Sequence, residues 1–352
     1  MRFEAYTLAV FVVAVVYLRS RGLRVDWQTF DYTFRPFLPA APRFLLFGVA
    51  LQVVYHLLVA PGVGPRGRQV ITYLRGAASF GWLVLWARLF VAYALFNYVY
   101  FWIKVCVPLL HHRLWDPLLW RLDRWLHLGI SPSVFAAELF EGSFLLAWLD
   151  RWYAWWILSV MGVVVFFAAA PRQDLRRSFL LSCSLLWTLG AAIYLAFPAV
   201  GPIYTDSAVF TPVIEDMPRA AGGHVALWEN YEKMIAGREG QLYAFNPTRG
   251  VAALPSLHVG AHVLFFLWAR RFAPALSPFL LAASILTFVG SVITGWHYAV
   301  DGYAGAALAL IAYCVARRLE PVASPEGAVE ADAGGHAGPS PPLAPTGSLD
   351  VV

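Results

Sequence analysis

Four residues in the last third of the chain have the types and the spacing that chemistry at a phosphate group requires. Ser256 and His258 follow Pro255 at the expected start of an apolar helix, where free backbone N–H groups and the helix dipole favour a bound anion. His297 and Asp301 stand four residues apart, so they share one helix face and the carboxylate can hold one imidazole nitrogen. The other nitrogen is then free to act as a nucleophile or a base.

Both clusters also have a purely structural interpretation. In this interpretation Ser256 is a helix cap with no further role, and His258 is an interfacial side chain. His297 and Asp301 can form a buried polar contact between helices, although an ionisable pair inside a membrane segment is costly and is usually functional. A zinc site that adds His262 is a third alternative, which the lack of an HExxH glutamate weakens.

The composition of the chain predicts a membrane protein. Hydrophobic residues make up 60% of the 352 residues and charged residues 13%, whereas soluble domains are roughly half apolar and about a quarter charged. The net charge of +5 comes from arginines between apolar runs, which indicates membrane orientation and argues against a nucleic-acid-binding surface. The three cysteines lie in separate apolar stretches, so we expect neither a disulfide framework nor a cysteine metal site.

Apolar stretches near the ~20-residue length that crosses a bilayer as a helix recur along the chain, and we expect about eight spans. The expected spans are residues 3–19, 43–62, 80–108, 152–170, 178–197, 256–270, 276–296 and 298–316. Two further stretches are expected to lie along the membrane surface. Residues 114–128 alternate tryptophan and leucine with charged residues in an amphipathic pattern, and residues 131–149 are apolar but carry two glutamates.

Arginine groups set the expected orientation of the second half. Those at residues 172–177, 270–271 and 317–318 mark cytoplasmic turns. The loop 198–255 and both histidine clusters therefore face the extracytoplasmic side. In the first half the same alternation places several arginines outside, against the positive-inside tendency. Either residues 131–149 also cross the membrane, or the later helices dominate the orientation.

We expect three parts in the chain. Residues 1–79 contribute additional transmembrane helices, the first of them uncleaved because no small-residue cleavage site follows it. Residues 80–318 form a membrane domain that carries both histidine clusters. Residues 319–352 are rich in Pro, Ala, Gly and acidic residues without an apolar period, which predicts a disordered cytoplasmic tail.

The segments Pro-Ser-Leu-His at 255–258 and His-Tyr-Ala-Val-Asp at 297–301 resemble two signature motifs of the type 2 phosphatidic acid phosphatase superfamily, which comprises lipid phosphate phosphatases and lipid phosphotransferases. The resemblance covers about residues 154–318. It implies an all-α, polytopic transmembrane bundle with a six-helix core, and it suggests that residues 80–318 form a lipid phosphatase/phosphotransferase-like domain. It also implies a lipid substrate in the bilayer and catalysis without a metal or a cofactor.

The resemblance assigns a role to each of the four residues. His297 would be the nucleophile that forms a phosphohistidine, and Asp301 would orient it. His258 would protonate the leaving group, while Ser256 would contact the phosphate. A phosphate dianion also needs a cationic partner, and Arg249 is the basic residue of the outer loop that lies nearest to Ser256 in sequence.

Three departures from the superfamily pattern bear on the reaction. No lysine is followed six residues later by Arg-Pro, Gly290-Ser291 stands where a Ser-Arg pair is usual, and Leu257 replaces a usual glycine. These features make the chain more similar to the inositol phosphorylceramide synthase branch. That branch implies transfer of a phospho-headgroup between lipids, with a phospholipid or sphingolipid as substrate. A lipid phosphate phosphatase and a non-catalytic lipid-binding membrane protein remain as alternatives.

Overall fold

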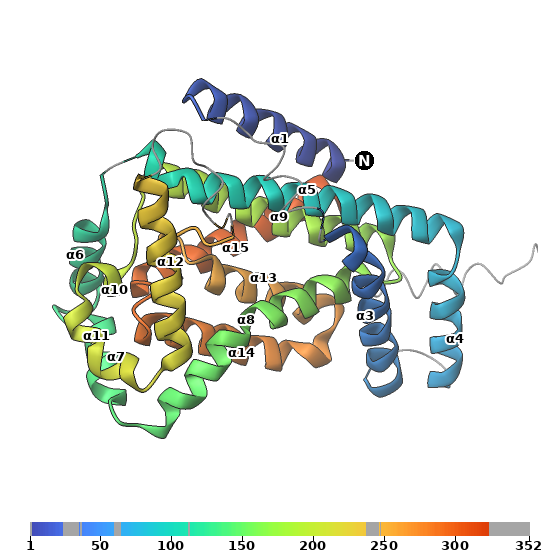
Figure 1. Ribbon diagram of the computed structural model, residues 1–352. Helices are drawn as coiled ribbons and strands as arrows, with labels where there is room; N and C mark the ends of the chain where they lie inside the picture. Colours follow the sequence, from blue (N-terminus) through green and yellow to red (C-terminus); the bar gives the residue numbers. More distant parts are fainter. Residues whose placement is uncertain are drawn as a thin grey trace, which may run out of the picture. The chain divides into compact units, whose positions relative to one another are not determined.

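The described residues form an all-helical structure. This computed structural model describes residues 2–23, 35, 37–59, 65–111, 113–236, 246 and 248–323. Within these ranges no strand occurs, and helices account for the regular structure (Figure 1). The predicted disordered tail, residues 319–352, falls outside the described residues from residue 324 onward.

Eight of the helices correspond to the eight predicted spans. These helices are α1 (Arg2–Ser20), α3 (Phe37–Leu58), α5 (Phe80–Leu110), α8 (Phe144–Ala168), α9 (Gln173–Ala196), α13 (Leu257–Phe272), α14 (Ser277–Ile293) and α15 (Ala299–Leu319). Six of them are long and apolar enough to cross a membrane, and α8 makes a seventh if its two bent halves count as one span. Because α13 has only 16 residues, the described chain has six or seven candidate spans where the sequence predicted eight. The all-α membrane bundle is confirmed.

The remaining helices have 3 to 19 residues, and several were not predicted. They are α4 (Arg66–Ala77), α6 (Asp116–Leu126), α7 (Pro132–Phe140), α10 (Pro202–Thr205), α11 (Ser207–Glu215), α12 (Pro218–Ala236) and the 3-10 helix η2 (Pro274–Leu276). The stretch 198–255, which was predicted as a loop, thus contains three helices. The single interfacial helix predicted for 131–149 is also wrong, because the chain turns after Phe140 and α8 begins at Phe144 with Ser143 as its cap.

The centre of the bundle is the contact between α13 and α15, which is flanked by α9 and α14. Two glycines allow these helices to approach closely. A Cβ added at Gly305 of α15 would lie 2.1 Å from the carbonyl oxygen of Ser256, and one added at Gly260 of α13 would lie 2.9 Å from the carbonyl oxygen of Gly305. Small residues that let backbones meet are the usual means of helix packing in membranes, and here they bring the two motif-bearing helices together.

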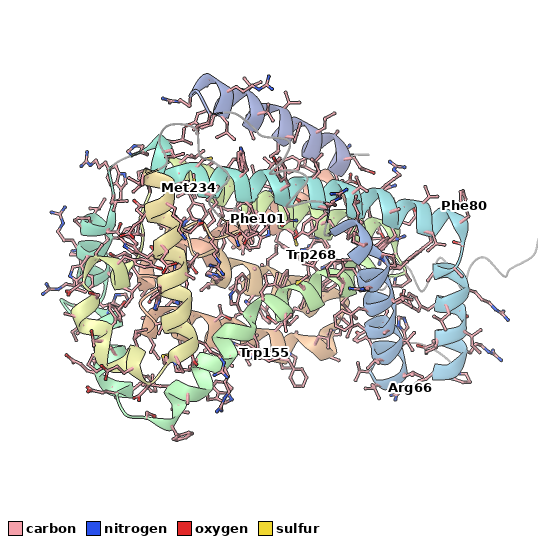
Figure 2. All side chains as sticks on the ribbon, viewed as in Figure 1. Arg66, Phe80, Phe101, Trp155, Met234 and Trp268 are labelled. Carbon is pink, nitrogen blue, oxygen red and sulfur yellow. The ribbon has the colours of Figure 1, made fainter. Side chains whose placement is uncertain are left out.

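The long helix α5 connects the centre of the bundle with its outer helices. Met234 near the end of α12 packs with Trp102 and Val105 of α5 and with Leu18 of α1 (Figure 2). On the other side α3 packs against α8, where Gln52 donates a hydrogen bond to the carbonyl of Phe166 at 2.8 Å. The outer helices therefore hold α5 and α8 in position, and these two helices line the cavity beside His258 and His297.

Candidate active site

The first motif forms the start of α13. Ser256 caps this helix by accepting a hydrogen bond from the N–H of Val259 at 3.4 Å. Its own N–H donates to the carbonyl oxygen of Asp301 at 2.9 Å. This backbone link joins the start of α13 to the first turn of α15, so the two motifs are held together independently of their side chains.

The two predicted histidines meet at the junction of these helices. Nδ1 of His258 and Nε2 of His297 lie 3.0 Å apart and share a hydrogen bond. His297 is 2% exposed, and Trp156 of α8 packs edge-on against His258 with ring centroids 4.2 Å apart. Thirty-nine residues of sequence separate the pair, and the structure places them in direct contact.

The carboxylate of Asp301 lies on the far side of His297. Its Oδ2 is 3.5 Å from Nδ1 of His297 and accepts a hydrogen bond from the N–H of Tyr298 at 3.0 Å. Asp301 is fully buried. The carboxylate of Asp301 faces Nδ1 of His297, while His258 faces Nε2, so the three predicted catalytic side chains form one row.

Two acidic residues of α6 support this row, and sequence reasoning did not identify them. Asp123 accepts hydrogen bonds from the N–H groups of Ala299 at 3.0 Å and Val300 at 2.8 Å, which caps the start of α15. Asp116 accepts from the Tyr298 hydroxyl at 3.1 Å. Burial raises the pKa of both carboxyls above the usual range, and their hydrogen bonds oppose that rise.

Two of the charged residues in the predicted amphipathic segment 114–128 face the protein and not the solvent. An amphipathic helix on a membrane surface turns its charged side chains to water, yet Asp116 and Asp123 are each 1% exposed. Trp125 and Leu128, in contrast, are 76% and 96% exposed. The acids face the protein because only they can satisfy the unpaired N–H groups at the start of α15, a demand that the local pattern does not reveal.

The turn before His297 is braced by the segment that leads into α10. Asp116 also accepts hydrogen bonds from the N–H groups of Val200 and Gly201, and the N–H of Ile203 donates to the carbonyl of Gly295 at 3.0 Å. Gly201 has a φ of +102°, and a Cβ there would lie 2.5 Å from the carbonyl oxygen of Trp296. Only glycine fits this close approach.

The ring of His262 does not join the predicted catalytic side chains. Its Nε2 shares a hydrogen bond with the hydroxyl of Ser159 at 2.8 Å, and its Nδ1 lies 3.0 Å from the carbonyl oxygen of His258. Both ring nitrogens are thus engaged away from His297. The zinc arrangement considered from the sequence is not formed, and in the part of the chain that the structure describes no group of three or more His, Cys, Asp or Glu side chains is placed to hold a metal ion.

A cavity of about 560 Å³ adjoins the paired histidines. Both His258 and His297 line it, and the rest of its wall is mainly aromatic and aliphatic side chains of α3, α5, α8 and α9, among them Phe101 (Figure 2). Along α9 the lining runs from Tyr194 to Leu180. These residues are about 21 Å apart at 1.5 Å per helical residue, or some two-thirds of the ~30 Å hydrocarbon thickness. A cavity of this length and polarity suits an acyl chain whose polar end lies at the histidines.

The two predicted phosphate-binding residues do not line this cavity. Ser256 is fully buried as a helix cap, and Arg249 is exposed, with its backbone carbonyl accepting a hydrogen bond from Asn230 at 2.9 Å. Among the described residues, the lysine or arginine that does line the cavity is Lys104 of α5. The sequence signal for Lys104 was a charged residue inside an expected span. Arg88 in the same span gives the same signal, but it forms an ion pair with Glu4.

His224 of α12 lies against Trp296 in the turn that precedes His297, and its burial makes the stability of the protein depend on pH. Its ring packs against Trp296 with centroids 4.6 Å apart and is 6% exposed. Burial lowers the pKa of His224 from 6.5 to about 4. The folded state therefore keeps this imidazole neutral at a pH at which the unfolded chain binds a proton.

We expect His224 to make the protein less stable as the pH falls from 6.5 toward 4. Between pH 7 and pH 5 its contribution to unfolding free energy should drop by about 2 kcal/mol, because a folded-state pKa below the unfolded value costs stability on protonation. The melting temperature in detergent at both pH values measures this, with His224→Phe as a ring-shaped variant that does not titrate. Equal losses in both proteins would show that His224 is not responsible.

The fold and the site define a helical membrane protein with a paired-histidine centre at the start of two adjoining helices. A family model described as the PAP2 superfamily matches residues 117–315, more than half of the chain. The chain belongs to this superfamily. Membership supports the assignment of the chain as an integral membrane protein and a phosphatase- or phosphotransferase-type function with a lipid substrate. Comparisons with curated proteins and with solved structures find no match.

Proposed function

We propose that the protein is a membrane lipid phosphotransferase that moves a phospho-headgroup between lipids through a phosphohistidine on His297. The observation that carries this proposal is the row of His258, His297 and Asp301 at one end of a long apolar cavity. The row supplies a nucleophile, a proton donor and an orienting carboxylate, while the cavity suits a lipid chain. By the positive-inside pattern of the later helices, the site lies on the extracytoplasmic face.

In the first step Nε2 of His297 attacks phosphorus, forming the N–P bond as the bond from phosphorus to the leaving oxygen breaks. His258 gives its proton to that oxygen, which leaves as the hydroxyl of a lipid such as diacylglycerol. In the second step an acceptor hydroxyl attacks phosphorus, returns its proton to His258 and releases His297. Asp301 holds Nδ1 of His297 through both steps and stabilises the positive charge of the ring.

Two observations favour transfer over hydrolysis. His297 is 2% exposed, so a phosphoryl group on its Nε2 would be largely shielded from bulk water. The walls beside it are mainly apolar, which favours an acceptor that brings its own hydrocarbon chain. Exclusion of water is a recognised way to protect a reactive intermediate from hydrolysis. Together with Leu257 in the first motif, these features support a relationship to the inositol phosphorylceramide synthase branch.

The test is turnover by the purified protein in lipid vesicles. Phospholipid donors are supplied with a ceramide or diacylglycerol acceptor, and phosphatidic acid is supplied alone as a monoester. We expect released diacylglycerol together with a new phospho-headgroup lipid, inhibition by orthovanadate and insensitivity to a chelator. Free phosphate from phosphatidic acid without lipid transfer would identify a phosphatase, and chelator-sensitive turnover would contradict the phosphohistidine route. No turnover with any donor would favour a lipid-binding role.

A further inference from the structure

Lys104 stands out among the charged residues of the transmembrane helices. It lies in α5, six residues before the end of that apolar helix, and among the described residues that line the cavity it is the one lysine or arginine. A charge inside a membrane segment is expensive and normally has a partner. Arg88 of the same helix has one in Glu4 at 2.8 Å, whereas no carboxylate of the described residues forms an ion pair with Lys104.

The surroundings of Lys104 connect it with the start of α13. Its ammonium nitrogen lies 5.8 Å from the centre of the Tyr194 ring, and the Tyr194 hydroxyl donates a hydrogen bond to the carbonyl of Pro255 at 3.1 Å. Pro255 is the first residue of the motif at 255–258. Lys104, His258 and His297 all line the same cavity, so the ammonium and both histidines border one space.

A phosphodiester in this cavity needs a cation. It carries a negative charge in the ground state, more charge develops on its oxygens during transfer, and the mainly apolar walls supply little to offset either. We propose that Lys104 binds the phosphate oxygens of the lipid substrate and stabilises the charge that forms during transfer at His297. The proposal rests on the proposed function of the site and assigns the phosphate-binding cation to a helix outside the matched residues 117–315.

A second interpretation of Lys104 is an interfacial anchor, in which its long side chain reaches toward the headgroup region near the helix end. The cavity argues against this role, because the side chain lines an internal space with His258 and His297. The two roles also differ experimentally. An anchor affects insertion and stability, whereas a phosphate-binding cation affects the affinity for phosphate and its analogues.

The first experiment compares Lys104→Met and Lys104→Arg with the wild type, using Lys233→Met as the matched control. Lys233 is the other lysine of the chain and is exposed on α12. We expect Lys104→Met to lower kcat/KM by about 100-fold or more, as loss of one charge-stabilising donor does, and to weaken orthovanadate inhibition. Lys104→Arg should restore part of the kcat/KM and part of the orthovanadate inhibition, and Lys233→Met should match the wild type. Unchanged turnover in folded Lys104→Met would overturn the proposal while leaving the proposed function intact.

The second experiment needs neither turnover nor a folded variant. The wild-type protein is treated with an amine-reactive reagent in the presence or absence of orthovanadate, and modification of its two lysines is read by mass spectrometry. Orthovanadate should slow modification of Lys104 several-fold and leave Lys233 unchanged. Protection in a protein that shows no lipid turnover would support Lys104 and count against the proposed reaction. Equal modification of Lys104 at saturating orthovanadate would overturn the assignment.

Discussion

Replacing His297 with alanine is expected to abolish transfer while leaving the bundle folded. The change removes the nitrogen that would form the bond to phosphorus, and the loss of a nucleophile from a catalytic unit costs on the order of 10⁴-fold or more in kcat. The helices should persist, because the backbone N–H groups at the start of α15 donate to the carboxylate of Asp123 and the carbonyl of Asp301 accepts from the N–H of Ser256. The measurement is product formation in vesicles, with the melting temperature and the gel-filtration profile as checks of folding.

The matched control for this variant is His56→Ala. His56 lies on α3, where its ring stacks against Tyr73 of α4 with centroids 5.3 Å apart, and it does not line the cavity. This variant should retain full turnover even if its melting temperature falls. Trapping with radioactive donor lipid should label the wild type with acid-labile phosphate and leave His297→Ala unlabelled. Substantial turnover or labelling in His297→Ala would contradict the role of His297 as nucleophile.

The convergence of His258, His297 and Asp301 could be predicted because it depends on short-range patterns and on topology. A spacing of four residues places a carboxylate beside an imidazole on one helix face. The arginine groups then placed both motifs at the same side of the membrane. The apolar lengths likewise predicted the positions of the long helices, since hydrophobic length is the dominant signal in a membrane protein.

The rest of the site depends on contacts that no local pattern records. Asp116 and Asp123 look like the solvated face of an amphipathic helix until their partners at Tyr298 and Ala299 are known. Arg88 and Lys104 lie in the same span, and only the three-dimensional structure shows that one is paired with a carboxylate and the other lines the cavity. The helices in 198–255 escaped prediction because their apolar stretches are short and interrupted.

The close approach of α13 and α15 makes Gly305→Ala the other substitution with a large expected effect. The new methyl group would lie 2.1 Å from the carbonyl oxygen of Ser256, which belongs to the backbone and cannot rotate away. The helices must separate by roughly 1 Å, and overpacking of this kind typically costs about 1–3 kcal/mol. His258 and His297 sit on either side of this contact, so separating the helices also separates the two histidines. A displacement of about 1 Å at a reacting site can reduce the rate about 100-fold.

The matched control is Gly162→Ala in α8, where nothing lies within 4 Å of the added methyl group. Alanine is a better helix former than glycine by about 1 kcal/mol, so this variant should melt at the same or a higher temperature and keep full turnover. Gly305→Ala should instead lose both stability and turnover despite the same gain in helix propensity. Gly305→Ala with wild-type turnover would mean that the α13–α15 spacing does not set the distance between His258 and His297. If the melting temperature of Gly305→Ala falls while its turnover stays at the wild-type level, Gly305 contributes to helix packing but does not set the geometry of the site.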